Sequence, residues 1–128
     1  MPTDRPALFE SGDFTLHSGA KSRWRINCRA ALIPEDWRTL ALMASERVEP
    51  FGLVWGIPRG GLSFEEALRP YITPGAKAML IVDDVWTTGA SMEGWRTILA
   101  DLQVPARGVV VFARSPVPPW VTVLFYAD

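Results

Sequence analysis

The stretch Met79-Leu80-Ile81-Val82-Asp83-Asp84-Val85-Trp86-Thr87-Thr88-Gly89-Ala90-Ser91 decides the fold of this chain. Its first four residues form an apolar run, which predicts a strand buried on both faces, and two carboxylates follow directly. The hydroxyl-rich segment 87–91 then leads into a helix predicted over 92–102. Open α/β sheets bind ligands at the carboxyl ends of their strands, so Asp83 and Asp84 fall at a predicted binding edge.

The segment 87–91 has the chemistry of an anion site. The first backbone N–H groups of a helix lack partners within the helix, and the three hydroxyls of this segment add further donors. Gly89 permits a positive φ or a close backbone approach. Asp83 and Asp84 repel phosphate, but carboxylate acceptors suit the vicinal hydroxyls of a ribose. The stretch therefore predicts a ribose 5-phosphate site, with an ordinary capped βα turn as the plain alternative.

The same residues resemble the signature of the type I phosphoribosyltransferases, which bind 5-phosphoribosyl 1-diphosphate (PRPP). The resemblance implies that Asp83 and Asp84 hold the ribose 2- and 3-hydroxyls and act in catalysis. It also implies that the following loop holds the 5-phosphate through Thr87, Thr88, Gly89, Ala90 and Ser91. Trp86 stands where the family usually has a smaller apolar residue.

A second apolar run, 51–55, ends in Gly56-Ile57-Pro58-Arg59-Gly60-Gly61 before a helix predicted over 62–68. This loop combines glycines for close approach with an arginine that suits phosphate oxygens. It resembles the pyrophosphate loop of the family, which often contains a cis peptide bond. The resemblance implies that Arg59, Gly60 and Gly61 face the diphosphate, with Arg59 also catalytic. An ordinary βα turn is the alternative.

The front of the chain, 14–27, resembles the amino-terminal segment of orotate phosphoribosyltransferases. There His17 replaces a lysine that reaches the diphosphate in those enzymes, and Lys21 adds positive charge, so both are predicted to contact PRPP. A solvent-exposed hairpin is the alternative for His17. The alternation of basic residues with Trp24 and Ile26 predicts a strand with one wet side.

Two parts of the chain are alternative candidates for the base site. Pro118-Pro119-Trp120-Val121 resembles the stretch whose aromatic ring stacks on the base in purine-type members, which makes Trp120 a candidate. Packing at a sheet edge or dimer contact is the alternative for Trp120. Orotate-like enzymes instead close the base pocket with the front segment, which makes Trp24 or Phe14 the candidate. The acceptor base is therefore not identified.

Strand and helix patterns alternate along the rest of the chain. A helix is predicted over 35–48, a third strand over 109–112, and an edge strand over 120–126. This order predicts a single α/β domain over 1–128: a Rossmann-like parallel sheet flanked by helices, with right-handed crossovers and a small N-terminal β segment. The resemblance implies the phosphoribosyltransferase version of that fold.

Composition narrows the function classes. A net charge of −1 in 128 residues argues against nucleic-acid binding, and no apolar run has the length of a membrane-spanning helix. Cys28 is the single cysteine, so no internal disulfide forms, and we expect it to be a small buried residue. The first thirty residues contain no signal-peptide pattern. A cytoplasmic protein is the simplest expectation.

The resemblance implies an enzyme, a glycosyltransferase that moves the phosphoribosyl group from PRPP to a nitrogenous base in nucleotide synthesis or salvage. Magnesium would enter with the diphosphate, with no direct protein ligand and with Asp83 and Asp84 in its outer sphere. Family precedent suggests a homodimer. Active members usually carry a mobile lid before the strand that leads into the two acids, and the segment between Gly61 and Met79 has no room for such a lid. A non-catalytic PRPP or nucleotide sensor on the same fold is therefore the alternative.

Overall fold

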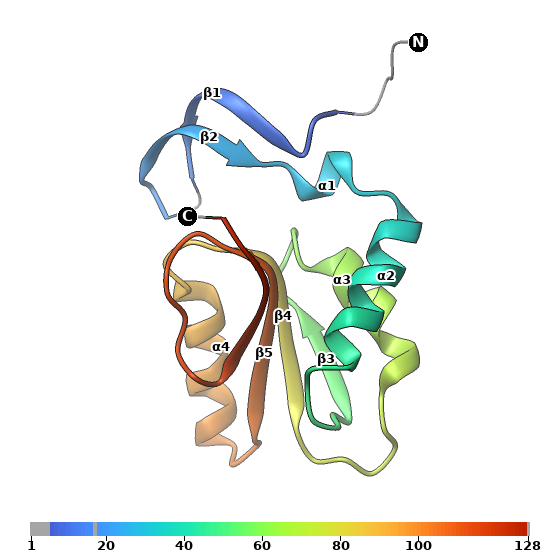
Figure 1. Cartoon of the computed structure of the whole chain (residues 1–128). Coiled ribbons are helices and arrows are strands. Elements are labelled where there is room, and N and C mark those ends of the chain that lie inside the picture. Colours follow the sequence, from blue (N-terminus) through green and yellow to red (C-terminus); the bar gives the residue numbers. More distant parts are fainter. Residues whose placement is uncertain (1–5, 17, 128) are drawn as a thin grey trace.

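The computed structural model describes residues 6–16 and 18–127. Figure 1 shows a parallel sheet with helices on both faces and a hairpin above its carboxyl-terminal edge. The sheet has the order β3-β4-β5-β6, with bounds Leu53–Gly56, Met79–Trp86, Ala106–Ala113 and Val121–Tyr126. The antiparallel hairpin consists of β1 (Phe9–Thr15) and β2 (Lys21–Ile26). The predicted α/β class, with its parallel sheet and small N-terminal β segment, is confirmed.

Two apolar clusters cover the two faces of the sheet. On one face, α2 (Pro34–Ser45) and α3 (Leu62–Leu68) pack against Leu80, Val82 and Val109. On the other, α4 (Ala90–Asp101) packs against Ile81 and Val110. Successive residues of β4 therefore point to opposite faces, and Leu80, Ile81 and Val82 are all fully buried. This confirms the prediction of a strand buried on both faces.

The prediction of right-handed crossovers throughout is wrong. The steps from β3 to β4 and from β4 to β5 go in the same direction across the sheet. Their helices nevertheless lie on opposite faces, as Figure 1 shows for α3 and α4. The hand of a crossover is set by direction and face together, so one of the two is left-handed. Packing on α2 holds α3 on its face of the sheet, since Phe64 of α3 meets Trp37 of α2 with ring centroids 5.9 Å apart.

The ends of the elements differ modestly from the predictions. Strand β4 continues through Asp83 and Asp84 to Trp86, because its pairing with β5 extends as far as Trp86 and Ala113. α2 ends at Ser45, three residues before the predicted end, while α3 has the predicted bounds. β6 lies at the edge of the sheet, as expected. The remaining elements are the short helices α1 (Cys28–Ala31) and η1 (Arg69–Tyr71).

None of the helices in residues 6–16 and 18–127 combines the length and the apolar character needed to cross a membrane.

Candidate functional site

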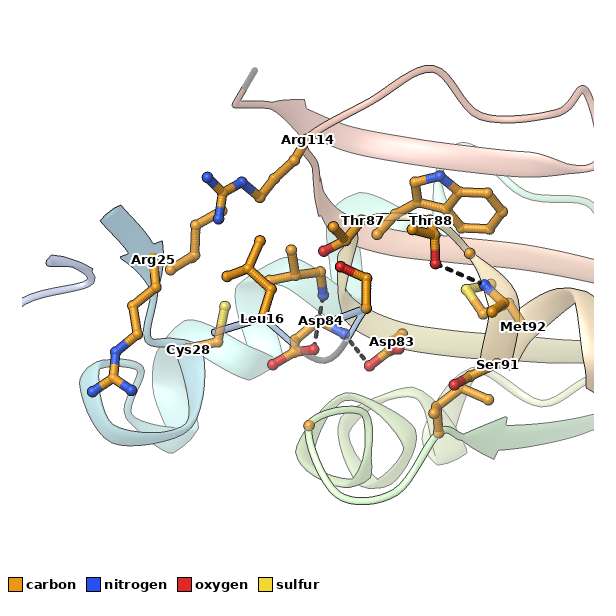
Figure 2. Close-up of a pocket in the computed structure, with 18 of the residues that line it drawn as sticks. Leu16, Arg25, Cys28, Asp83, Asp84, Thr87, Thr88, Ser91, Met92 and Arg114 are labelled. Atoms are coloured by element: carbon orange, nitrogen blue, oxygen red, sulfur yellow. Dashed lines mark hydrogen bonds between the residues drawn. The ribbon is translucent and has the colours of Figure 1, made fainter. Parts of the chain in front are cut away.

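A cleft of about 460 Å³ lies at the carboxyl end of β4, beneath the hairpin. Its volume is in the range of small-molecule sites. Four parts of the chain line it: the end of β4 with the following loop 87–91, the loop after β3, the hairpin with α1, and the end of β5. Figure 2 shows Asp83 and Asp84 in the middle, with Arg25 and Arg114 on one side and Thr87, Thr88 and Ser91 on the other.

The acid pair is held by its own backbone. The N–H of Asp84 donates to Asp83 Oδ1 at 2.8 Å, and the N–H of Val85 donates to Asp84 Oδ1 at 2.8 Å. Burial, together with the adjoining Asp84 carboxyl, raises the pKa of Asp83 to about 8. At neutral pH the Asp83 carboxyl therefore tends to keep its proton, and the two neighbouring carboxyl groups lie where both can accept hydroxyl hydrogen bonds.

The loop 87–91 takes the form expected of an anion site. Gly89 is the N-cap residue of α4, with a φ of 78°, and having no side chain it makes no cap hydrogen bond; the one side-chain acceptor at the first turn among the described residues is Thr88 Oγ1, which accepts from Ala90 N–H at a long 3.4 Å. The indole of Trp86 is buried beneath the loop, directly against Gly89. A side chain at position 89 would collide with that indole. The loop is thus supported from below, and backbone N–H groups at the start of α4 are left for a ligand.

The loop after β3 lies against the acid pair. A Cβ added to Gly60 would be 2.5 Å from Asp84 Oδ2, so only glycine permits this approach. The peptide bond between Pro58 and Arg59 is cis, as the resemblance implies. Gly61 packs on the backbone of β4, while Arg59 is exposed and is not among the residues that line the cleft. Of the three residues predicted to face a diphosphate, Gly60 is the one in the cleft wall.

The hairpin forms the second wall, through Phe14, Thr15, Leu16, Ser18 and Arg25. The guanidinium of Arg25 lies 4.5 Å from the centre of the Phe14 ring and pairs with Glu10 at 2.7 Å. Lys21 is exposed and donates to Thr15 Oγ1 at 2.8 Å, so its contact with PRPP stays a prediction. His17 lies outside the described residues.

Arg114 is the cleft residue that the sequence reasoning missed. It follows β5 directly and donates to Trp24 O at 3.2 Å and to Ser22 Oγ at 3.0 Å. Its guanidinium carbon lies 3.4 Å from the centre of the Trp24 ring, and burial lowers its pKa. The available signal was its position, since it follows the strand that neighbours β4 and so falls at the same edge of the sheet.

Neither predicted base-stacking residue lines the cleft. Trp120 packs against the α4 side of the sheet, and its indole N–H donates to Glu93 Oε1 at 3.1 Å. Trp24 stacks on Arg114 instead of facing the cavity. The aromatic ring from the candidate set that does line the cleft is Phe14. Base stacking by Trp120 or Trp24 therefore stays a prediction.

Cys28 is buried, as expected, in the cleft floor. Burial and the nearby Asp84 and Asp83 charges raise the pKa of its thiol, which keeps it in the unreactive thiol form. Among the described residues, no cluster of three or more His, Cys, Asp or Glu side chains forms a metal-binding group. A metal ion at this site would need most of its ligands from a bound molecule.

No protein-family model matches this chain, and no curated protein sequence matches it either. Solved structures do. The chain is similar to an orotate phosphoribosyltransferase from Aeropyrum pernix, with 23% identity, a TM-score of 0.70 and coverage of 93% of this chain and 88% of that one. It is also similar to the Mycobacterium tuberculosis orotate phosphoribosyltransferase (15% identity, TM-score 0.70, coverage 93% and 89%).

Purine-type enzymes are similar as well. For the xanthine-guanine-hypoxanthine phosphoribosyltransferase of Helicobacter pylori the identity is 15% and the TM-score 0.52, with coverage of 70% of this chain and 84% of that one. At these identities the comparisons show the fold alone. The chain therefore has the fold of the type I phosphoribosyltransferases, as the resemblance of the stretch 79–91 implied.

Proposed function

We propose that this protein binds PRPP in the cleft at the end of β4 and transfers its phosphoribosyl group to a nitrogenous base. One observation carries the proposal: the acid pair and the loop 87–91, whose positive-φ Gly89 begins α4, line the same cavity. The loop N–H groups would hold the 5-phosphate, while Asp83 and Asp84 would accept hydrogen bonds from the ribose hydroxyls. The shared fold of orotate and purine phosphoribosyltransferases supports it.

The diphosphate would then lie between the loop after β3 and the hairpin. Gly60 lets the backbone of the first loop approach the acid pair, and Arg25 brings positive charge from the second. Departure of diphosphate leaves a sugar with oxocarbenium character, so charge neutralisation at the leaving group lowers the barrier. Arg59 adjoins Gly60 and is exposed, and we propose that its guanidinium turns towards the diphosphate when PRPP binds.

Magnesium fits this site as a companion of the substrate. The described residues offer two carboxyl groups and no third ligand, which matches an ion held mainly by diphosphate, ribose oxygens and water. Bound there, magnesium would neutralise charge on the leaving diphosphate. Asp83 and Asp84 would orient it through hydroxyls or water. We propose a homodimer in the cytoplasm as the working form, which sedimentation and fractionation test.

A PRPP sensor without turnover is the second candidate, and one observation favours it. Between η1 and β4 the described chain has only the turn region 72–78, which leaves no lid over the diphosphate. Water exclusion would then be incomplete, and binding without transfer is the expected consequence.

Two measurements test these proposals. Calorimetry with PRPP and magnesium should give saturable binding, and its absence would remove both the enzyme and the sensor. The double variant Asp83→Asn with Asp84→Asn should weaken binding, while the exposed pair Asp101→Asn and Glu66→Gln serves as the charge-matched control. Release of diphosphate over a panel of pyrimidine, purine and other nitrogenous bases then separates the enzyme from the sensor and identifies the acceptor.

A further inference from the structure

The loop 56–61 lies at the free edge of the sheet, where a strand has unpaired main-chain groups. Ile57 N–H donates to Val82 O of β4 at 2.9 Å, so the N–H of Gly56 points to the opposite side. β3 is the terminal strand of the sheet, and no described strand pairs with it there. Without a partner for the Gly56 N–H, the start of the loop would be held on its β4 side alone.

Glu65 of α3 supplies the missing partner. Its Oε1 accepts the hydrogen bond from Gly56 N–H at 2.8 Å, and its Oε2 pairs with Arg69 at 2.6 Å. The Glu65 side chain is only 13% exposed, whereas that of Arg69 is 63% exposed. The carboxylate is therefore fixed at one end by a helix neighbour and holds the loop with the other.

The close packing of the loop makes this hydrogen bond consequential. A Cβ on Gly56 would collide with Gly61 O and with Glu65 Cβ, so the two ends of the loop and α3 meet at one point. From this point the chain runs to Gly60, which lies against the Asp84 carboxylate. Only three residues separate Gly56 from Gly60, so the position of the one constrains the position of the other.

We propose that Glu65 is a positioning residue for PRPP, which it never touches. It acts by fixing the loop 56–61 against Asp84, and this inference rests on the proposed PRPP function of the cleft. A glutamine at position 65 keeps an oxygen that accepts from Gly56 N–H and loses only the charge. A methionine has similar length and offers no comparable acceptor. The pair separates the hydrogen bond from side-chain volume.

The test compares Glu65→Gln with Glu65→Met for PRPP affinity and for amide hydrogen exchange at Gly56 and at Gly61, whose N–H donates to Ile57 O at 2.8 Å. We expect Glu65→Met to weaken PRPP binding about tenfold or more, with faster exchange at both amides, and Glu65→Gln to stay within about threefold of the wild type. Glu66→Ala is the control, since this exposed neighbour on α3 is not the acceptor, and it should leave affinity unchanged.

Equal behaviour of Glu65→Gln and Glu65→Met would overturn the inference, because the hydrogen bond would then be irrelevant. Unchanged exchange at Gly56 in Glu65→Met would do the same. Should the wild type bind no PRPP, the proposed function fails by itself, and the exchange rates still decide whether Glu65 holds the loop. A Glu65→Met protein that does not fold is replaced by Glu65→Leu, which also lacks an acceptor.

Discussion

Gly60→Ala is the substitution that most directly tests whether the acid pair belongs to the ligand site. The new Cβ would lie 2.5 Å from Asp84 Oδ2 and 2.6 Å from Oδ1. To reach an ordinary contact of ~3.5 Å, the carboxylate must retreat by about 1 Å. Misplacement of a binding group by that distance can cost on the order of 100-fold. We therefore expect the Kd for PRPP with magnesium to rise between about 10-fold and 100-fold.

The same substitution should leave the fold largely intact. The moving group is the end of a side chain, and the hydrogen bond most affected is that from Val85 N–H to Asp84 Oδ1. Its loss costs about 1 to 3 kcal/mol. Calorimetry measures the Kd, and urea unfolding measures stability. Gly94→Ala is the matched control, because a Cβ at this position of α4 meets open space. A folded Gly60→Ala protein that binds PRPP as the wild type does would refute the reasoning.

Three further outcomes are expected. Gly89→Ala should lower the free energy of unfolding by more than the ~1–2 kcal/mol that a left-handed backbone costs a residue with a side chain, because the new Cβ also meets the Trp86 indole. Trp86→Leu should remove the part of the loss that comes from this collision, as measured in a double-mutant cycle of urea unfolding. Burial raises the pKa of Asp83 in the folded protein to about 8, above the ordinary value of 3.8, so this carboxyl contributes most stability below pH 3.8 and loses it as the pH rises towards 8. The free energy of unfolding of Asp83→Asn should therefore gain roughly 2 kcal/mol or more on that of the wild type across this range, and a constant difference would contradict the assignment. Trp120→Ala should lower the free energy of unfolding by about 2 to 3 kcal/mol without raising the KM for any accepted base, since the ring packs off the cleft; a raised KM would restore it as the stacking residue.

The sequence was sufficient where the determinants are local. The apolar run before Asp83 makes a buried strand in any α/β context, and the glycine at 89 has the positive φ that the loop requires. Strand, acids, hydroxyl loop and helix succeed one another without a gap, so their relative positions follow from the chain itself. That is why the fold class, and the placement of the acid pair next to the loop 87–91, were predictable from one short stretch.

Contacts between distant segments were not predictable in the same way. The approach of Gly60 to Asp84 depends on the register between β3 and β4, and the contact of Arg114 with Trp24 spans 90 residues. The position of Trp120 relative to the cleft was not predictable for a related reason. Its distance from the cleft depends on which side of β5 and β6 meets α4, and an isolated aromatic in a Pro-rich stretch carries no signal for that.

The hairpin bears on whether the cleft supports transfer as well as binding. A developing oxocarbenium ion must be shielded from water, and the described residues between η1 and β4 provide only a turn. The remaining cover is the hairpin, which lies over the acid pair and contributes Phe14 and Leu16 to the cavity. Arg114 ties that cover to the sheet through Ser22 and Trp24. If transfer occurs, shielding must come from this anchored hairpin, so loss of the Arg114 contacts should reduce turnover more than it reduces PRPP affinity.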